Sequence, residues 1–312
     1  MPEGSMRSLG IERPRSSRPV AADIDVFGFT HQGKLRRENQ DQFLIASLHK
    51  LLRVHQTSLP EQDQAPLVSE SRGYIFLVAD GVGGRPDGDV ASGTALRTIA
   101  RYVTHFTDLY RRVDPDKEAA FLAELTQSVS HSHQVLLEES EREYEGRGMA
   151  TTLTMVAVLW PRAYLVQVGD SRCYRLRNGQ LERVSKDQTI AQELLDAGAL
   201  SPAEAEISPY RGVLAHALGG PQAVPQTTAT DCKWEDVLLV CSDGLTRHVS
   251  EAEIRDELVG LMTAEQSCQR LIAKALERGG EDNITVVIGR LRPRLGSQPS
   301  SANLHPSPLP RL

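Results

Sequence analysis

The sequence predicts a layered α+β fold, and three observations support this prediction. Short apolar runs rich in β-branched residues recur along the chain, as they do in buried strands. Longer segments repeat apolar residues at helical spacing. The predicted order is strand, two helices, a block of strands, a helical excursion, strand, helices and strand. Because a doubly wound parallel sheet requires strands and helices to alternate strictly, this order favours layered α+β.

The predicted elements follow from these two periodicities. Apolar runs predict buried strands at residues 74–79, 151–160, 163–168, 237–241 and 284–288, with a further candidate at 43–46. Helical spacing predicts helices at residues 90–106, 118–139, 190–197, 251–261 and 264–277. The polar stretch 49–72 predicts a long surface loop or hairpin.

The two ends of the chain differ in composition from its centre. Residues 1–20 and 293–312 are rich in Pro, Ser and Arg and lack hydrophobic periodicity, which predicts flexible tails. We therefore expect one folded unit at residues 21–292. The 312-residue chain is 40% hydrophobic, which is enough to bury one large core or two modest ones.

Charge and cysteine usage argue against several classes of function. Lys and Arg number 35 against 41 Asp and Glu, and the net charge of -6 predicts no binding to nucleic acid or to an anionic membrane. The four cysteines form no C-x-x-C pair, which predicts reduced structural thiols and not a zinc site or disulfides. The sequence shows neither the apolar core of a signal peptide nor a run long enough to span a membrane, so we expect a soluble, cytoplasmic protein.

Acidic residues recur in tight turns at the ends of apolar strands. Asp80, Asp170 and Asp243 follow predicted strands, and Asp282 precedes the last one. A single Asp-Gly after a strand is most simply a turn, because these residues supply the hydrogen bond and the positive φ that turns need. Several acids at the ends of core strands can instead converge on one patch, where unpaired carboxylates would repel each other. A bound cation would remove that repulsion.

The lack of a His or Cys cluster beside these acids indicates which cations they would bind. Oxygen-only ligands select hard cations, so Mg²⁺ or Mn²⁺ fits better than zinc or copper. Two such ions about 4 Å apart clamp a displacement at phosphorus and lower the pKa of a bridging water. Phosphoester hydrolysis is therefore the activity that the residues predict.

A further charged segment, Arg36-Arg37-Glu38-Asn39-Gln40-Asp41, precedes the candidate strand at 43–46. The guanidinium of Arg36 could bind phosphate oxygens through two parallel hydrogen bonds, which a lysine cannot do. The alternative is a solvated charge run, and the local sequence alone favours this alternative.

Six short blocks occur along residues 24–291: R-R-E-N-Q-D at 36–41, D-G-V-G-G at 80–84, G-M-A-T-T-L at 148–153, G-D-S-R at 169–172, S-D-G-L at 242–245 and D-N-I-T at 282–285. Together they resemble the metal-dependent protein phosphatase family, the type 2C Ser/Thr phosphatases, and specifically its bacterial branch. Each block is weakly specific by itself. The blocks are strongly specific in this order, which is the order of the family.

The resemblance implies a central antiparallel β-sandwich flanked by helices on both faces, in four layers, with metals in a cleft at one end. It implies hydrolysis of phosphoserine and phosphothreonine by attack of a bridging hydroxide held between two Mn²⁺ or Mg²⁺ ions. By the same resemblance, Asp80 would bridge the two ions and the carbonyl of Gly81 would join the first. Asp243 and Asp282 would bind the second ion.

The resemblance also assigns roles to four residues around the two ions. Arg36 would hold the substrate phosphate, and Asp41 would hydrogen-bond metal-bound water. Asp170, with help from Asp243, would match the weaker third metal site of bacterial members. Asn283 would orient its neighbours by hydrogen bonds.

Three positions depart from the commonest pattern of the family. Gln40 stands where many relatives have Glu, so a neutral amide replaces a carboxylate and we expect one metal to bind more weakly. Val82 stands where eukaryotic members have a histidine proposed as general acid, so we expect a metal-bound water to protonate the leaving oxygen. Ala150 replaces a frequent glycine, which is a small change.

The segment 185–220 resembles the helix and mobile flap beside the cleft of the family, and we expect substrate choice to be decided there. The resemblance implies that the partners are phosphorylated Ser/Thr proteins, including a cognate Ser/Thr kinase and its targets. We expect the protein to be a monomer.

Three alternatives fit parts of the sequence. Residues 23–26 match the D-x-D-x-V signature of haloacid-dehalogenase-type phosphatases, but residues 18–22 make a poor preceding strand. Residues 169–171 are superficially similar to the G-D-S turn of serine esterases, but the chain contains no D-x-x-H. The non-enzymatic alternative is a catalytically weak phosphoprotein-binding or regulatory domain with the same fold. Joint retention of Arg36 and the acidic residues argues against it.

Overall fold

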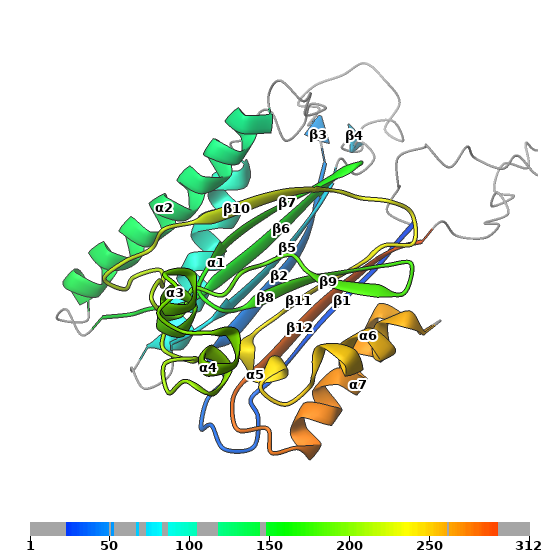
Figure 1. Ribbon diagram of the computed structural model, residues 1–312. Helices are drawn as coiled ribbons and strands as arrows, with labels where there is room; N and C mark the ends of the chain where they lie inside the picture. The colour runs from blue at the N-terminus through cyan, green and yellow to red at the C-terminus, as the bar shows by residue number, and fades with distance from the viewer. Residues whose placement is uncertain are drawn as a thin grey trace, which may run out of the picture.

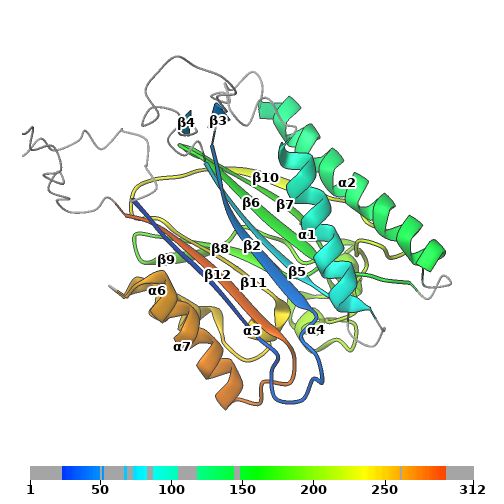
Figure 2. The ribbon, with the colours of Figure 1, turned by 180° about the vertical axis from the view of Figure 1, so that it is seen from behind.

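Within the described residues, two antiparallel sheets of five strands each lie face to face at the centre of the molecule (Figure 1). The computed structural model describes residues 23–49, 51–52, 67–68, 73–82, 87–104, 118–143, 148–260 and 262–292. Helices α1 and α2 cover the outer face of one sheet, and α6 and α7 cover the outer face of the other (Figures 1 and 2). The predicted four-layer α+β sandwich is confirmed.

The first sheet pairs the first described strand with the last. Its strand order is β1-β12-β11-β8-β9, and all its pairings are antiparallel. The pairing of β1 with β12 runs from Ile24 opposite Leu291 to His31 opposite Ile284. The strands of this sheet are β1 Ile24–His31, β8 Arg172–Arg177, β9 Gln180–Arg183, β11 Val237–Cys241 and β12 Ile284–Leu291.

The second sheet has the order β10-β7-β6-β5-β2 and is also antiparallel. Its central strands read as continuous apolar runs because helices cover one face and the first sheet covers the other. The strands of this sheet are β2 Asp41–Leu48, β5 Gly73–Asp80, β6 Leu153–Leu159, β7 Arg162–Val168 and β10 Gln226–Asp231.

Apolar clusters fill the three spaces between the layers. The outer helices are α1 Gly88–Thr104, α2 Glu118–Glu143, α6 Glu251–Val259 and α7 Ala264–Glu277. Ile99 and Leu125 are buried between α1, α2 and the second sheet, and Leu271 is buried between α7 and the first sheet. Phe76 and Val240 meet between the sheets. Burying one such side chain contributes roughly 1.5–3 kcal/mol relative to exposing it, so these cores fix the positions of the strand ends.

The predicted strands and helices all correspond to elements of the structure. The ends differ by a few residues, and residues 105, 106 and 261 of two predicted helices lie outside the described residues. The sequence does not predict β1, β8, β9 or β10. The edge strand β10 reads QTTATD and is partly exposed, and β8 carries three arginines, so neither has a clean apolar pattern.

The segment 49–72 contains a short antiparallel pair, β3 Leu51–Leu52 with β4 Leu67–Val68. The rest of this predicted loop or hairpin lies outside the described residues, apart from residue 49. The predicted tails at residues 1–20 and 293–312 also lie outside them.

Asp25 of the D-x-D-x-V segment has a structural position. It lies in β1, and its Oδ2 accepts a hydrogen bond of 2.8 Å from the backbone N–H of Ala264, the first residue of α7. A carboxylate at this place satisfies an N–H that the helix leaves unpaired and complements the helix dipole. The segment therefore joins β1 to α7 in this fold.

The cysteines are free and buried, as predicted. Burial raises the pKa of the Cys173, Cys232 and Cys268 thiols to about 12, so these thiols remain protonated at neutral pH. None of the described helices combines the length and the apolar character that a bilayer crossing requires.

Candidate active site

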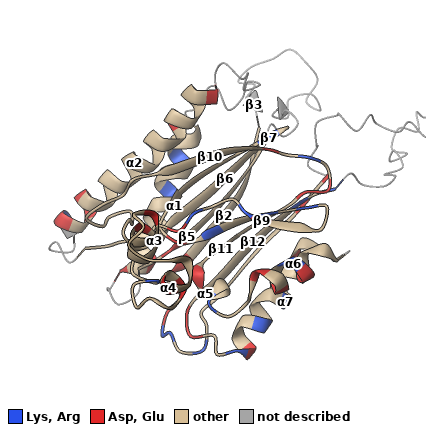
Figure 3. Ribbon diagram, in the orientation of Figure 1, with Lys and Arg blue, Asp and Glu red and all other residues tan. Residues whose placement is uncertain are grey.

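The aspartates that the sequence singles out lie where strands begin or end. Asp80 is the last residue of β5 and Asp41 is the first of β2, and the two lie directly opposite each other in the antiparallel pairing. Asp170 follows β7, Asp243 begins the short helix α5 after β11, and Asp282 precedes β12. Figure 3 shows acidic segments at this end of the sheets, beside α5. The element α5 runs over Asp243–Thr246.

Asp41 links the two sheets beneath this group of acids. Only 1% of its surface is exposed, and its Oδ2 accepts hydrogen bonds of 2.7 Å from the hydroxyls of Ser242 and Thr285. Its Oδ1 is buried and has no hydrogen-bond partner among the described residues. A buried carboxylate oxygen without a partner is unfavourable, so this atom is suited to accept a water or to face a cation.

The backbone of Asp80 is held on both sides by a threonine pair. Its N–H donates to Oγ1 of Thr152 at 3.1 Å. Its carbonyl accepts from Oγ1 of Thr151 at 2.9 Å and from the N–H of Thr152 at 2.8 Å. These bonds engage the backbone of Asp80 and not its carboxylate, so they position the side chain without neutralising it.

Asp170 lies in the turn between β7 and β8, with 8% of its surface exposed. The preceding Gly169 has φ +107°, and a Cβ there would come within 2.7 Å of the Thr152 side chain. Gln188 holds this turn through two hydrogen bonds. Its side-chain Oε1 accepts from the backbone N–H of Gly169 at 2.7 Å, and its backbone N–H donates to the Gly169 carbonyl at 3.0 Å. The turn thus requires glycine and places Asp170 beside the threonine pair that holds Asp80.

Two arginines contact the acids from the exposed side. Arg36 donates from Nε to Oδ1 of Asp282 at 2.7 Å and from Nη2 to Oδ2 at 2.8 Å, which is the two-pronged geometry of a guanidinium on a carboxylate. Nη1 of Arg247 lies 3.2 Å from Oδ2 of Asp282, and its Nη2 donates to Oδ2 of Asp243. Arg36, Asp282, Arg247 and Asp243 therefore form a chain of alternating charges.

Asn283 fixes the segment that carries Arg36. Its Nδ2 donates to the carbonyls of Gln32 at 2.7 Å and Glu38 at 2.9 Å, and its Oδ1 accepts the N–H of Gln40 at 2.9 Å. The side chain is buried, with 5% of the residue exposed. One amide thus holds both ends of the loop around Arg36 next to Asp282.

Gln40 and Gly81 pack together at the start of α1. A Cβ on Gly88 would come within 2.8 Å of the Gln40 side-chain amide, and a Cβ on Gly81 would come within 2.5 Å of the Gly88 carbonyl oxygen. The Gln40 carbonyl accepts the N–H of Gly81 at 3.2 Å and the hydroxyl of Ser92 at 2.7 Å. Residues 83 and 84 of the D-G-V-G-G block lie outside the described residues.

Burial and mutual repulsion make these carboxyl groups hard to ionise. Loss of hydration is the largest cause of the shifts. It raises the pKa of Asp80, Asp170 and Asp243. It also raises the pKa of Asp41, to about 7. For Asp80 the next causes are the negative charges of its acidic neighbours. For Asp243 the guanidinium of Arg247 opposes the rise. The strand ends therefore bring the acids close enough to interact.

The side chains as placed do not form a ready metal site. Among the described residues, no group of three or more His, Cys, Asp or Glu side chains could hold a metal ion as it stands. Arg36 and Arg247 instead provide the cations that Asp282 and Asp243 contact. The donors nevertheless fit hard divalent ions, because they are oxygen atoms, they repel one another, and Oδ1 of Asp41 is buried without a partner.

The segment 185–220 borders the site on one side. It contains α3 Ile190–Asp196 and α4 Pro202–Ile207, and its end pairs with Thr151. Thr151, whose hydroxyl donates to the Asp80 carbonyl, exchanges backbone hydrogen bonds of 3.0 and 2.9 Å with Leu218. The exposed large apolar side chains of this segment are Ile207, Tyr210 and Val213.

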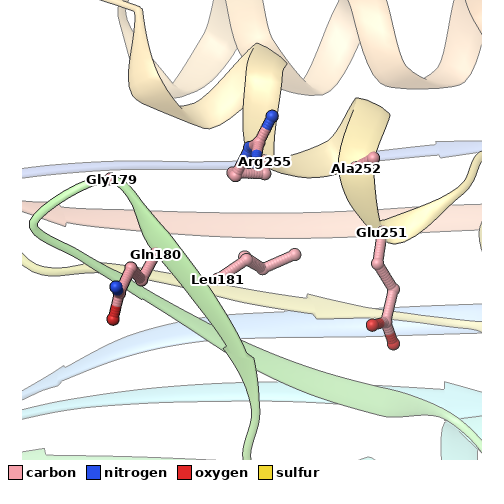
Figure 4. Close-up of a pocket in the computed structure, with 6 residues that line it drawn as sticks. All are labelled: Gly179, Gln180, Leu181, Glu251, Ala252 and Arg255. Atoms are coloured by element: carbon pink, nitrogen blue, oxygen red, sulfur yellow. The ribbon is translucent and has the colours of Figure 1, made fainter.

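A pocket of about 390 Å³ lies elsewhere, between the β8–β9 turn and α6 (Figure 4). Its lining residues are Gly179, Gln180, Leu181, Glu251, Ala252 and Arg255. None of the aspartates at the strand ends lines it, so this pocket is separate from the candidate site.

Sequence reasoning missed the residues that support the acids. Arg247 follows Asp243 by four residues, and this helical spacing is the signal that could have found it. Ser242 directly precedes Asp243, and Thr285 lies two residues after Asn283, but nothing in the sequence says that their hydroxyls meet Asp41.

Comparisons with known proteins give a consistent result. The family model of protein phosphatase 2C matches residues 53–279. The serine/threonine phosphatase Stp of Listeria innocua is 32% identical over 260 residues, which are 83% of this chain and 92% of that protein. The serine/threonine protein phosphatase PstP of Mycobacterium tuberculosis is 37% identical over 215 residues, which are 69% of this chain and 40% of that protein. The chain thus matches less than half of the length of PstP.

A solved structure shows the same fold. The catalytic domain of the serine/threonine protein phosphatase PstP, in complex with two manganese ions, matches with a TM-score of 0.65 and 30% identity. The match covers 86% of this chain and 97% of that chain.

Replacing Asn283 by alanine is expected to lower the free energy of unfolding by about 2–4 kcal/mol, because a buried side chain loses three part-buried hydrogen bonds, each of which contributes roughly 0.5–1.5 kcal/mol. Urea unfolding monitored by circular dichroism measures the change. The control is Gln134→Ala on α2, whose side chain makes an exposed bond to Glu138 and should change stability by less than about 0.5 kcal/mol. An equally small change for Asn283→Ala would show that Asn283 does not hold the loop around Arg36 in place.

The metal-free protein is expected to lose stability as the pH rises towards neutrality. The pKa of Asp41 is raised in the folded state to about 7, so its contribution to stability is complete below its ordinary pKa and is lost as the pH rises through about 7. Melting temperatures measured in chelator between pH 5 and 8 test this. The amide oxygen in Asp41→Asn can still accept hydrogen bonds from both hydroxyls, so the melting temperature of this variant should fall less steeply with pH. A fall as steep as that of wild type would assign the effect to other groups.

Proposed function

The chain belongs to the protein phosphatase 2C family, and we propose that it is a metal-dependent phosphatase that hydrolyses phosphoserine and phosphothreonine in other proteins. The observation that carries this proposal is the meeting of Asp80, Asp243 and Asp282 with Arg36 at one end of the sandwich. Relatives named as serine/threonine phosphatases support the substrate class.

The proposal assigns two Mn²⁺ or Mg²⁺ ions to the strand ends. Asp80 would bridge both ions, the Gly81 carbonyl would join the first, and Asp243 and Asp282 would hold the second; Asp170 with Asp243 would hold a weaker third. When bound, such ions lower the pKa of water and offset the charge of the phosphoryl group. The complex of the PstP catalytic domain with two manganese ions supports this assignment.

Arg36 would hold the phosphate group of the substrate. Its Nε and Nη2 already donate two parallel hydrogen bonds to Asp282, and the same two donors match two oxygens of a phosphate. Its side chain is 39% exposed, so a substrate can reach it. Asn283 holds the loop in place, which keeps the guanidinium beside the acids.

Asp41 would orient a water molecule beneath the phosphate. Ser242 and Thr285 hold its Oδ2, which leaves the buried Oδ1 as an acceptor in a fixed position. The side chain of Val82 cannot donate a proton, so the leaving oxygen of the substrate would receive its proton from water in the site.

The second candidate function is a phosphoprotein-binding or regulatory domain with little turnover. The observation that favours it is that arginines contact Asp243 and Asp282, and no ready metal group exists among the described residues. Hydrolysis of p-nitrophenyl phosphate, measured with Mn²⁺ and with chelator, separates the two candidates. Metal-dependent turnover supports the phosphatase, and its absence supports the binding domain.

The proposal extends to partners and to domain organisation. The partners would be phosphorylated Ser/Thr proteins, including a cognate Ser/Thr kinase and its targets. The protein would act as a monomer in the cytoplasm. Residues 21–292 would form the phosphatase domain, with tails at 1–20 and 293–312. The net charge of -6 supports the exclusion of nucleic acid as a main ligand. The border segment 185–220 would select among phosphopeptides.

Asp80→Asn or Asp243→Asn is expected to reduce turnover by orders of magnitude, because each substitution removes an anionic ligand of a catalytic metal. Steady-state hydrolysis of a phosphothreonine peptide with saturating Mn²⁺ measures the loss. Asp256→Asn, on the exposed surface of α6, is the control and should retain full activity. Activity within a few-fold of wild type for the first two variants would refute their assignments.

Arg36→Ala is expected to raise KM for a phosphopeptide by about tenfold or more, with a smaller effect on kcat, because a charge-assisted hydrogen bond to phosphate is lost in ground and transition states alike. The neighbouring Arg37, which is exposed, provides the matched control Arg37→Ala. A normal KM for Arg36→Ala would remove the arginine from substrate binding.

A further inference from the structure

Arg247 contacts two acids of the candidate site, Asp243 and Asp282. It caps the C-terminal end of α5, directly after Thr246. One guanidinium nitrogen, Nη2, donates to Oδ2 of Asp243, and the other, Nη1, lies 3.2 Å from Oδ2 of Asp282. A single cation therefore bridges two carboxylates that come from separate parts of the chain.

The position of Arg247 follows from local geometry. It stands four residues after Asp243, so one turn of helix brings the two side chains to the same side. Asp282 reaches the same guanidinium from the turn before β12. The side chain of Arg247 is 47% exposed, whereas those of Asp243 and Asp282 are 14% and 15% exposed. The guanidinium thus covers the two acids on their solvent side.

Arg247 and Arg36 differ in what they contact. Arg36 contacts Asp282 through both of its prongs, whereas Arg247 divides its nitrogens between Asp282 and Asp243. Asp243 and Asp282 are the two residues assigned to the second metal ion. A guanidinium and a divalent cation repel each other, so both cannot lie close to the same carboxylate oxygens without loss of affinity.

We propose that Arg247 competes with the second metal ion for Asp243 and Asp282, so that the chain carries its own counter-cation and must release it when the ion binds. The inference deepens the proposed function and rests on it only for the identity of these two ligands. Arg247 would therefore lower the affinity of the second site for metal while stabilising the metal-free fold.

The surroundings of Arg247 allow such a release. Gly212, in the segment 185–220, lies beside the guanidinium. A Cβ on Gly212 would come within 3.8 Å of Nη2 of Arg247, so the glycine leaves room there. The exposed side chain can move from the acids into solvent or along this segment without opening the core. Its long aliphatic stem permits that movement while the helix stays in place.

Isothermal titration calorimetry of the metal-free protein with Mn²⁺ tests the competition. Arg247→Gln keeps a polar but shorter side chain and removes the charge, and it should bind the second Mn²⁺ more tightly, by about tenfold. Arg247→Lys retains one positive charge that cannot bridge both acids, and its affinity should lie between those of wild type and Arg247→Gln. Arg255→Gln, on the exposed face of α6, should titrate as wild type.

Melting temperature provides a readout that does not depend on activity or on tight binding. In chelator, Arg247→Gln should melt below wild type, because the two acids lose their counter-cation. At saturating Mn²⁺, the difference should shrink or vanish. Equal or weaker Mn²⁺ binding by Arg247→Gln would overturn the competition, as would a melting difference that persists unchanged with metal. Wild type that binds no Mn²⁺ at all would overturn the proposed function itself, which distinguishes the two failures.

Discussion

Repulsion between buried carboxyl groups is the constraint on which the site depends. Asp41 and Asp80 lie opposite each other in two paired strands. Burial is the largest cause of the raised pKa of Asp80, and the negative charges of the neighbouring acids raise it further. Such a group is unfavourable in a folded chain unless positive charge lies nearby. The fold supplies two guanidinium groups on the solvent side and hydroxyl donors beneath. The remaining charge defines what the site can bind.

The sandwich makes this repulsion tolerable by holding each acid on a rigid support. Hydrogen bonds from Thr151 and Thr152 fix the backbone of Asp80, and Asn283 fixes the loop that carries Arg36. These supports come from both sheets, and the apolar clusters between the layers fix the position of one sheet relative to the other. An arrangement of this kind favours divalent ions and phosphate over a single neutral ligand, because it offers fixed anionic oxygens and cationic nitrogens close together.

Much of the fold follows from the sequence, because its buried strands are continuous apolar runs such as β5 and β6. Two strands could not be predicted in this way: the edge strand β10, which is rich in threonine, and β8, which carries three arginines. Their side chains face solvent or form ion pairs, so the strands lack a continuous apolar run. Asp80, Asp170 and Asp243 could be found from their place after apolar runs, and Asp282 from its place before one. Their supporting contacts could not: that Ser242 and Thr285 meet on Asp41, or that Arg247 reaches Asp282, depends on how distant turns are brought together by packing.

We propose that the acids at the strand ends gather to hold divalent cations. Anomalous diffraction at the manganese absorption edge, from crystals grown with Mn²⁺, locates the ion independently of activity. We expect strong anomalous peaks within bonding distance of the carboxylates of Asp80, Asp243 and Asp282. Well-ordered crystals with full-occupancy Mn²⁺ only at other places, and none at these oxygens, would contradict it.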